Sequence, residues 1–347
     1  MKAPENLLIV RTDRIGDVVL SLPLAGLVKK HFPECKVTFL LRGYTKTLVE
    51  EHPYIDEIII LKEENSKVSI KENINRVKKK HFDVSIVVSP TFTTSLILFF
   101  AKIKKRIGTG YRSYSFLFNK RVYEHRKYAE KHELEYNVNL LNEIGIHEKI
   151  SPTTVNFDIR INSENKENIN LLLKSEKINN DDKLVIIHPG SGGSSVDLPI
   201  EKMIALTKML SEVDDLKIIV TGDSSEKELC DKFILKETVI NMAGKLNLSE
   251  LKALLNHADI FISNSTGPIH IAAALGKFTV GFYPKILACS PQRWGPFTDK
   301  KAIFSPSIDC NNCTREQCEK LDCMNSIDIG KVFDEIKREM KVKNYGD

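Results

Sequence analysis

The stretch DIFISNSTGPIHIAAALGKFTVGF, residues 259–282, decides the fold class of this chain. It opens with an apolar run of strand type, turns through SNSTG and reaches Pro268. Proline suits the first position of a helix, because a missing N–H costs nothing there. Small apolar residues continue the helix as far as Gly276, and a second strand follows. The stretch predicts a βαβ unit whose glycine-bearing turn is either an ordinary helix cap or a place where free N–H groups attract an anion.

Outward from this unit, strands and helices alternate in two successive series. Strands are predicted at 6–12, 36–41, 55–61, 83–88 and 105–108 in the first series, and at 183–188, 217–221, 239–240, 260–262 and 278–282 in the second. Helices are predicted between them, among others at 18–31, 92–102, 201–211 and 226–235. Such alternation produces parallel sheets with right-handed crossovers, so the fold class is α/β.

A polar interval rich in Asn, Lys and Glu, near residues 163–183, separates the two series. It predicts an N-terminal domain over 1–165 and a C-terminal domain over 166–326. Residues 327–347 include an amphipathic helix, which we expect to pack back toward the N-terminal domain. Two domains also suit a length of 347 residues, which is long for a single core.

Composition and charge limit the classes of function. The 42% hydrophobic and 28% charged residues are proportions of a soluble globular protein. A net charge of +5 is small for this length; it allows an acidic ligand or an anionic membrane surface and gives no reason to expect nucleic acid. The sequence lacks the ~20-residue apolar run that spans a bilayer, and its start lacks a signal-peptide pattern. We therefore expect a cytoplasmic protein, peripheral at most on the inner face of the cytoplasmic membrane.

Several motifs, taken in order, resemble one known family. Near the N-terminus IVRT is followed by GDVVLSLP, and RIG stands at 106–108. The second half carries HPGS at 188–191, AGK at 243–245, NSTGPIHIAAALG at 264–276 and WGP at 294–296. The series, over about residues 6–327, is similar to glycosyltransferase family 9 and its ADP-heptose:lipopolysaccharide heptosyltransferases.

The resemblance implies a GT-B fold, in which two Rossmann-like domains face each other across a cleft. It implies an inverting transferase of lipopolysaccharide inner-core synthesis that uses no catalytic metal. The implied partners are a nucleotide-sugar donor, with ADP-heptose first, and a lipid-linked or oligosaccharide acceptor ending in Kdo or heptose. Two alternatives stay open: the same transfer to a protein, as in autotransporter heptosyltransferases, and a non-catalytic nucleotide-sugar-binding protein.

An inverting transfer needs a base that takes the proton of the acceptor hydroxyl. Asp17, directly after Gly16 at a helix start, matches the catalytic aspartate position of the family. The residues around Asp17 alone also fit an ordinary acidic residue at a helix N-terminus. The helix dipole would lower the pKa of such a residue, and a lower pKa makes a weaker base. Arg11 lies on the first strand just before this turn and is expected to face an acidic group of the acceptor, such as a Kdo carboxylate or a phosphate, with the assistance of Arg42 and Arg112.

The departing diphosphate needs hydrogen-bond donors and positive potential. The turn at Thr266 and Gly267 is expected to supply them, and by the family pattern Glu226 holds the ribose hydroxyls. The residues expected at the donor are Ser191, Gly192, Glu226, Lys245, Leu246, Ser265, Thr266, Gly267 and His270.

Two departures from the family pattern concern this donor. The segment Ser195–Pro199 has no cation where core heptosyltransferases often carry Lys or Arg, and Ser265 stands where Asp is common. A buried charge-assisted phosphate contact is worth about 1.5–3 kcal/mol. Either the donor sugar differs, therefore, or another cation such as Lys285 or Arg293 replaces the missing one.

Cys310, Cys313, Cys318 and Cys323 have the spacing C-x2-C-x4-C-x4-C. Four thiolates at this spacing suit a tetrahedral zinc or iron site, and reduced thiols in an irregular loop are the alternative. A metal there is expected to fix the loop and to take no part in the reaction. Basic runs at Lys78–Lys80 and Lys102–Arg106 are either solvated faces or contacts with anionic lipid.

Overall fold

The computed structural model describes residues 3–179, 181–308 and 313–342. It contains two compact units, Met1–Arg160 and Ile161–Asp347. The division falls just before helix α6 (Ser163–Ser175), whereas the boundary expected from the sequence, between residues 165 and 166, lies inside the first turn of that helix.

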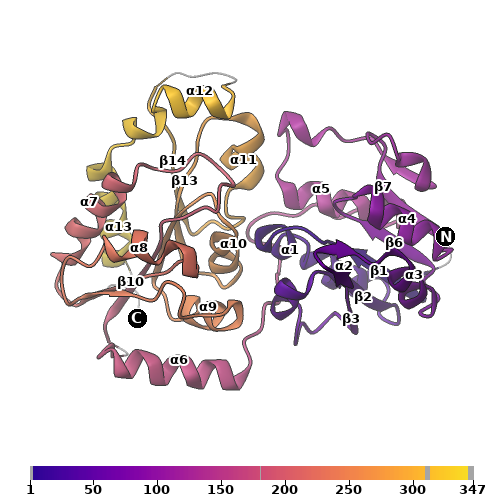
Figure 1. The fold of residues 1–347 in the computed structure, drawn as a ribbon, viewed down its shortest axis with the longest axis horizontal. Coiled ribbons are helices and arrows are strands. Elements are labelled where there is room, and N and C mark those ends of the chain that lie inside the picture. Colours follow the sequence, from indigo (N-terminus) through magenta and orange to yellow (C-terminus); the bar gives the residue numbers. More distant parts are fainter. Residues whose placement is uncertain (1–2, 180, 309–312, 343–347) are drawn as a thin grey trace. The chain divides into compact units, whose positions relative to one another are not determined.

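The first unit is a six-stranded parallel sheet with helices around it (Figure 1). Its strand order is β3-β2-β1-β6-β7-β8. The strands are β1 (Asn6–Val10), β2 (Lys36–Leu41), β3 (Glu57–Ile60), β6 (Val84–Val87), β7 (Lys105–Thr109) and β8 (Lys120–Val122), with a small antiparallel pair of β4 (Glu63–Glu64) and β5 (Lys67–Val68). The helices are α1 (Ile15–Val19), α2 (Pro23–His31), α3 (Ile70–Lys78), α4 (Phe92–Phe100) and α5 (Glu133–Asn139), and the 3-10 turns are η1 (Gly43–Leu48), η2 (Ser115–Leu117), η3 (Arg126–Tyr128) and η4 (Leu140–Ile144).

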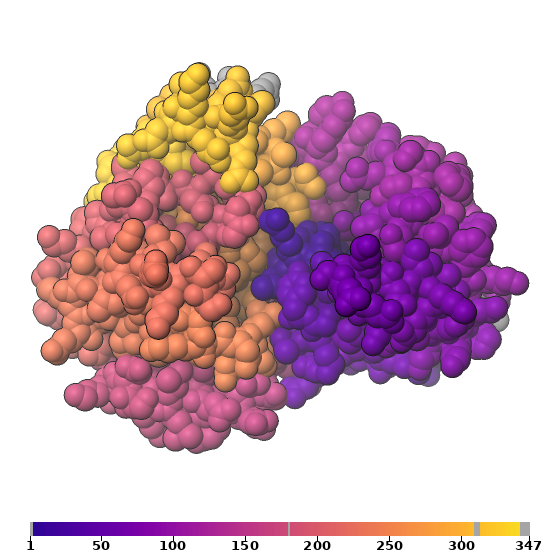
Figure 2. All heavy atoms as spheres, in the orientation of Figure 1, coloured from indigo at the N-terminus to yellow at the C-terminus, as the bar shows by residue number. Residues whose placement is uncertain are grey.

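The second unit repeats this plan with the order β11-β10-β9-β12-β13-β14, again all parallel. Its strands are β9 (Lys183–His188), β10 (Leu216–Val220), β11 (Val239–Asn241), β12 (Ile260–Asn264), β13 (Phe278–Phe282) and β14 (Lys301–Phe304). Its helices, after α6, are α7 (Ile200–Ser211), α8 (Lys227–Asp231), α9 (Leu248–Leu255), α10 (Gly267–Ala274), α11 (Pro291–Trp294), α12 (Arg315–Lys320) and α13 (Ile329–Val342), and the 3-10 turns are η5 (Ser224–Glu226), η6 (Leu287–Cys289) and η7 (Cys323–Ser326). Helix α6 packs against α9 and lies at the lower edge of this unit in Figure 2.

The central strands are buried on both faces, which explains why they read as continuous apolar runs rather than alternating ones. Residues 7–10 of β1 and 184–187 of β9 are almost inaccessible, and helices cover their sheets from both sides. Within the described residues, no helix is both long and apolar enough to cross a bilayer.

One predicted helix, 18–31, is two helices in the structure. Helix α1 ends at Val19, and α2 begins at Pro23 after a short turn. Proline lacks the N–H that an internal helical position donates, and its ring crowds the preceding turn, so it starts a helix rather than continuing one. The break gives the segment after β1 a short first helix that carries Asp17.

The apolar stripe of the C-terminal helix α13 belongs to the second unit. Val332 and Ile336 are fully buried in the core of that unit, and packing of residues 327–347 toward the N-terminal domain stays a prediction. Ile329 and Phe333 pack against the same core, and the helix contacts α7. Burial of this stripe completes the helix layer beside β9 and β10.

Candidate active site

Both sheets reverse their strand order beside their first strand. In the first unit β1 lies between β2 and β6, and in the second unit β9 lies between β10 and β12. The crossover helices on the two sides of such a strand lie on opposite faces of the sheet. The loops at the carboxyl end of the strand therefore diverge and open a crevice, where α/β proteins bind ligands. Two loop systems occupy these positions: residues 11–17 after β1, and residues 189–198 with 265–267 after β9 and β12.

A buried charge cluster lies after β1. The guanidinium of Arg11 is ion-paired to three carboxylates: its Nε is 2.6 Å from Asp13 Oδ1, its Nη2 donates to Asp17 Oδ1, and its Nη1 is 3.5 Å from Glu133 Oε1. Glu133 also pairs with Arg126, which extends toward β8. We call these five residues the Arg11 cluster.

The Arg11 cluster contains three carboxylates and two guanidinium groups, so its formal charge is negative. Arg11 is only 1% exposed. Burial raises the pKa of Asp17 above its usual value of 3.8, and the Arg11 guanidinium opposes that rise, while Asp13 and Glu133 add to it. Burial and neighbouring anions thus act on this pKa in the direction opposite to the dipole of the short helix α1. A carboxylate with these surroundings is a better proton acceptor than an exposed one.

The structure contradicts the acceptor contact expected for Arg11. A side chain that is enclosed and paired with Asp13, Asp17 and Glu133 has no surface left for a substrate carboxylate. Arg11 instead positions Asp17 and limits the rise of its pKa. The sequence showed Arg11 and Asp17 as neighbours, but Glu133 is 122 residues from Arg11 and carried no signal of its own.

Arg42 and Arg112 lie after β2 and β7, at the same sheet edge as Asp17. Arg42 makes a two-point contact with Glu63, at 3.2 and 2.6 Å. Arg112 is exposed, and its backbone N–H donates to Ser115 Oγ at 3.0 Å. Both arginines therefore lie at the carboxyl edge of this sheet, and their contact with an acceptor stays a prediction.

In the second unit, Asn264 joins the two loops that flank the strand-order reversal. Its Nδ2 donates to the carbonyl of Pro189 at 2.7 Å, and its Oδ1 accepts from the N–H of Leu198 at 2.8 Å. Ser194 adds a third link, since its Oγ donates to the carbonyl of Ser265 at 2.7 Å. The loop 189–198 is therefore held against the start of α10.

Thr266 and Gly267 begin helix α10, as expected, and Ser265 precedes them. The Thr266 side chain is nearly buried, and among the described residues its hydroxyl has no hydrogen-bond partner. His270 lies one turn into α10 and is also buried. Free amides at a helix start next to an unsatisfied hydroxyl suit an anionic ligand.

Glu226 lies against the backbone of the loop after β9. A Cβ added at Gly190 would meet Glu226 Oε1 at 1.6 Å, and one added at Gly222 would meet Glu226 Oε2 at 3.0 Å. Gly244 has φ +72° and approaches Ser224 of the same turn. These three glycines, each of which follows a different strand, thus make room for η5. Within this turn, Glu226 Oε2 accepts a hydrogen bond from the N–H of Asp223 at 2.9 Å. The Glu226 carboxylate thus lies against the backbone at the carboxyl ends of β9 and β10, and its contact with ribose hydroxyls stays a prediction.

Lys245 and Leu246 follow Gly244 at this same edge, where the N–H of Gly244 donates to the carbonyl of Gly222 at 3.0 Å. Lys245 is exposed and Leu246 is half-buried. Both residues lie beside η5, and a role next to the base of a nucleotide stays a prediction.

The turn 191–194 has contacts that sequence reasoning missed. Gly192 and Gly193 have φ of +54° and +70°, which favours glycine, and Ser191 Oγ donates to Asp197 Oδ2 at 2.9 Å. Arg315 of α12 donates from Nη1 to the carbonyl of Gly193 at 2.8 Å. Burial raises the pKa of Asp197 to about 6, against the opposing effects of Ser191 and Arg315.

The sequence of this loop contains no cation, and folding brings Arg315 to it from α12. The two substitutes considered from sequence are engaged elsewhere: Lys285 donates to the carbonyl of Ile308 at 2.8 Å, and the Arg293 guanidinium lies 4.9 Å from the Trp294 ring centroid. Residue spacing offered no signal for Arg315, because it belongs to the cysteine-containing segment and reaches the turn only through folding.

The cysteine segment is described only in part, because Cys310 lies outside the described residues. Cys318 and Cys323 are buried in the core of the second unit, and Cys313 packs against it. Among the described residues, no three His, Cys, Asp or Glu side chains are grouped to hold a metal ion. The described cysteines thus serve as core residues, and a zinc or iron ion remains a prediction.

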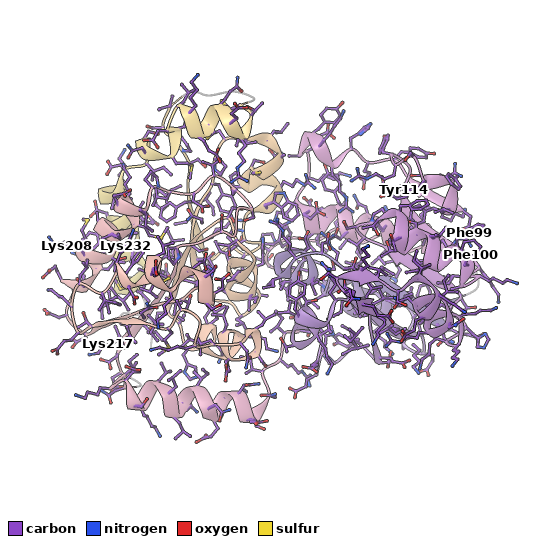
Figure 3. The ribbon with its side chains drawn as sticks, viewed as in Figure 1. Phe99, Phe100, Tyr114, Lys208, Lys217 and Lys232 are labelled. Carbon is purple, nitrogen blue, oxygen red and sulfur yellow. The ribbon has the colours of Figure 1, made fainter. Side chains whose placement is uncertain are left out.

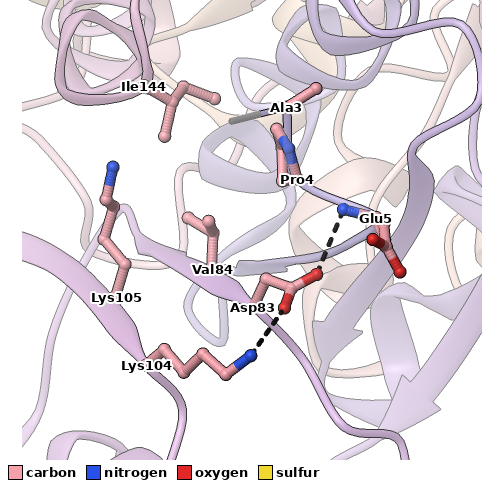
Figure 4. A pocket seen from close by; sticks show the side chains of 8 residues that line it. All are labelled: Ala3, Pro4, Glu5, Asp83, Val84, Lys104, Lys105 and Ile144. Carbon is pink, nitrogen blue, oxygen red and sulfur yellow. Dashed lines mark hydrogen bonds and ion pairs between the residues drawn. The ribbon is translucent and has the colours of Figure 1, made fainter. Parts of the chain in front are cut away.

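Hollows in the first unit occur at both edges of its sheet. One of about 240 Å³ lies at the amino ends of β1, β6 and β7, where Asp83 pairs with Lys104 and accepts from the N–H of Glu5 (Figure 4). It is at the wrong edge for Asp17. A smaller one of about 20 Å³, room for about one water, lies at the carboxyl ends of β6 to β8 and is lined by Glu124 and Arg126. Arg126 thus belongs both to the Arg11 cluster and to the lining of this hollow.

The two units, each a parallel sheet with ligand loops at its strand-order reversal, have the Rossmann-like architecture of the GT-B fold class. The particular family follows from comparison with known sequences: residues 71–323 match glycosyltransferase family 9 (heptosyltransferase). The chain belongs to this family, and it is an enzyme of the transferase class.

Among curated relatives, a putative glycosyltransferase of Haemophilus influenzae is 28% identical over 316 residues, covering 87% of this chain and 89% of its own. Lipooligosaccharide heptosyltransferase 2 of Campylobacter jejuni is 24% identical, covering 94% and 96%. A crystal structure of a family 9 glycosyl transferase from Veillonella parvula has a TM-score of 0.82 at 19% identity, over 98% of both chains. The E. coli heptosyltransferase WaaC with ADP has a TM-score of 0.75 at 15% identity, over 96% and 99%. The structural likenesses support the fold.

Proposed function

We propose that this enzyme transfers a heptose from ADP-L-glycero-D-manno-heptose to a Kdo or heptose residue of a lipopolysaccharide inner-core acceptor, with inversion. The family and the heptosyltransferase relative support the sugar, and the ADP bound to WaaC supports the nucleotide. The observation that carries the proposal is the Arg11 cluster, which holds a partly buried aspartate at the carboxyl edge of the first sheet.

In this proposal Asp17 takes the proton of the acceptor hydroxyl while that oxygen attacks the anomeric carbon of the heptose. Arg11 holds one Asp17 oxygen, which orients the other toward the acceptor. Burial raises the pKa of Asp17, and the Arg11 guanidinium opposes that rise, so the carboxylate is more basic than an exposed aspartate. Arg42 and Arg112 contact the acidic groups of the acceptor.

The bond from the heptose to the diphosphate breaks in the same step, and its electron pair goes to ADP. We assign the departing charge to the amides at Thr266 and Gly267, with the Thr266 hydroxyl and the turn at Ser191 and Gly192. Arg315 adds positive charge beside that turn. His270 and Ser265 lie beside these groups and contact the diphosphate and the sugar of the donor.

A nucleotide-sugar panel tests the donor. Thermal-shift measurements with ADP-heptose, UDP-glucose and GDP-mannose are expected to show stabilisation by ADP-heptose alone, since ligands stabilise the form that binds them. A transfer assay with ADP-heptose and a Kdo-lipid A acceptor is then expected to release ADP. Stabilisation by UDP- or GDP-sugars instead would overturn the donor assignment.

A protein acceptor, kept from the sequence, is the second candidate; the iron-containing glycosyltransferase TibC of E. coli has a TM-score of 0.58 to this chain, which itself carries four clustered cysteines. Metal analysis of the purified enzyme against Cys313→Ser tests the metal: one equivalent of zinc or iron, lost in the variant, would support a structural ion. The non-catalytic alternative is set aside by family membership. We also propose that the enzyme works in the cytoplasm, at the inner face of the membrane, since its acceptor is anchored in lipid.

A further inference from the structure

Helix α4 has an outer face that its own unit leaves uncovered. None of its residues is charged. Ile97 and Leu98 pack in the core, while Phe92, Phe99 and Phe100 are each about half exposed. A surface helix ordinarily carries polar side chains on its outer stripe. Grouped exposed phenylalanines therefore indicate a surface that contacts something apolar.

Phe116 of η2 extends this surface. Its side chain is 66% exposed, and η2 contacts α4. Arg106 joins the two segments, because its guanidinium lies 5.2 Å from the Phe99 ring centroid and its Nε donates to the carbonyl of Leu117 at 2.8 Å. Phe99 and Phe100 themselves meet edge to face at 5.4 Å between ring centroids. Figure 3 shows both at the outer edge of the first unit.

Lysines surround these rings. Lys102 and Lys104 follow α4 directly, and the Lys104 side chain is 84% exposed; its pair with Asp83, at 3.5 Å, is a weak surface contact. Asn119 accepts from the N–H of Arg106 at 2.8 Å and donates to the carbonyl of Lys104 at 2.7 Å, which brings exposed Lys120 beside them. We call Phe99, Phe100, Phe116, Lys102, Lys104 and Lys120 the aromatic–basic face.

The net charge of the chain is concentrated in the segment that contains this face. Residues 91–127 contain nine of the 51 Lys and Arg residues and one of the 46 Asp and Glu residues. This segment is therefore +8, and the remaining 42 basic and 45 acidic residues sum to −3, which together give the +5 of the whole chain. A single basic segment in an otherwise slightly acidic protein indicates an anionic partner rather than a general solubility effect.

We propose that the aromatic–basic face docks on an anionic lipid bilayer, with its three phenyl rings in the headgroup boundary and its lysines beside lipid phosphates. Phenyl burial at that boundary removes apolar area from water, and the lysines are attracted by the negative surface potential. A second copy of this chain fits poorly, because two faces of like charge repel. Nucleic acid fits poorly too, because rings at an interplanar angle of 87° do not offer parallel platforms for successive bases.

Docking goes beyond the proposed transfer, and either can fail without the other. The test is co-sedimentation of the full-length protein with vesicles of phosphatidylcholine alone or with about one third phosphatidylglycerol, at low and high salt. We expect binding to the anionic vesicles only, with loss at high salt because the Debye length shortens from about 10 Å at 0.1 M to about 3 Å at 1 M. Binding to both vesicle types alike, or to neither, would overturn the proposal.

Two pairs of variants, each a test and its control, locate the face. Phe99→Ser/Phe100→Ser/Phe116→Ser is expected to weaken binding at least about tenfold, and Phe99→Leu/Phe100→Leu/Phe116→Leu to retain most of it. Lys102→Glu/Lys104→Glu/Lys120→Glu is expected to abolish it, whereas the equal charge change Lys208→Glu/Lys217→Glu/Lys232→Glu in the second unit leaves it nearly intact (Figure 3). Equal losses in both lysine variants would show a general charge effect and refute the face.

Sedimentation velocity provides the remaining check. The wild type and the serine variant are expected to have the same mass in solution. A dimer that the serine substitutions convert to a monomer would assign the face to a second copy and overturn lipid docking. Circular dichroism confirms that the variants fold, and the leucine variant keeps the test informative if the serine variant does not.

Discussion

The two sheet edges that carry ligand loops have the same topology and opposite chemistry. After β1 the loop buries charge: Arg11 lies among Asp13, Asp17 and Glu133. After β9 and β12 the loops are built from glycines, serines and amides, with Asn264 as a neutral link. A strand-order reversal therefore provides only a place for a ligand, and the residues of its loops decide whether that place handles protons or phosphates.

The difference has a physical reason. A base needs a perturbed pKa, which only burial and fixed neighbouring charges produce, and buried charges must be paired to be tolerated. A phosphate site needs unpaired N–H groups and close backbone approach, which glycine allows and a charged side chain would obstruct. Each prediction below alters one of these two properties.

The largest effect is expected for Asp17→Asn. The amide keeps the size of the side chain but cannot take a proton, so kcat is expected to fall about 10²–10⁴-fold with little change in donor affinity. The wild-type rate is expected to fall as the pH drops through the pKa of Asp17, which burial raises above 3.8. Steady-state kinetics across pH measure both. Asp13→Asn, which removes another partner of Arg11, is the matched control and is expected to cost much less; equal losses would refute the assignment of the base.

The next largest effect is expected for Gly190→Ala, which fills the space between the loop after β9 and the Glu226 side chain. The new methyl would meet Glu226 Oε1 at 1.6 Å, so the carboxylate must move from its position against the loop. Overpacking of this kind costs about 1–3 kcal/mol, and we expect ADP affinity to fall about tenfold. Isothermal titration measures the change. Gly43→Ala in the first unit, where the nearest atom is Ile60 Cγ2 at 3.6 Å, is expected to leave binding unchanged.

Arg315→Ala tests the cation brought to the glycine turn. The guanidinium is half exposed, so its contact with a diphosphate is worth about 0.5–1.5 kcal/mol, and ADP affinity is expected to fall about two- to tenfold. The salt dependence of binding is expected to become shallower as well. Lys320→Ala, on the same helix, controls for loss of one charge. If both variants bind ADP alike, Arg315 merely anchors Gly193.

The smallest effect concerns Asp197→Asn and stability. Because the folded pKa is about 6 and the ordinary value is 3.8, the folded state binds more protons between these pH values, so stability falls as pH rises through that window. The amide removes the cost of the buried charge. Above pH 6 we expect a gain of about 1 kcal/mol, or about 2–4 °C in Tm, and below pH 3.8 almost none. Asp214→Asn, at an exposed position, is the control in thermal scans; a gain independent of pH would contradict this account.

Strong periodicity made most central strands predictable. The runs that form β1, β9 and β12 are continuous and apolar because both faces of each strand are covered. β8, with only three residues, and α12, with six, were not predicted, since short segments at the edge of a unit carry little pattern. The prediction of a single helix at 18–31 was wrong, because a second helix starts at Pro23. The apolar run on both sides of Pro23 favoured one continuous helix, although proline typically starts a helix.

The residues of the candidate site also differ in how well the sequence predicts them. Loops after strands were predictable as ligand positions, because all strands of a parallel sheet end at one edge. Partners from distant segments were not, since Glu133 and Arg315 reach Arg11 and Gly193 only through folding. Arg11 was assigned to the acceptor from its position before the turn, and burial gave it the different task of positioning Asp17.

By itself the sequence determined two parallel α/β units, their glycine turns and the family to which they belong, because periodicity and motif order are local properties of the chain. Tertiary structure alone decided which charges are buried, which are paired and which glycines make room for a side chain. Burial, pairing and close approach depend on neighbours that are remote in the chain. The basicity of Asp17 and the exposure of the aromatic–basic face are therefore properties of the fold.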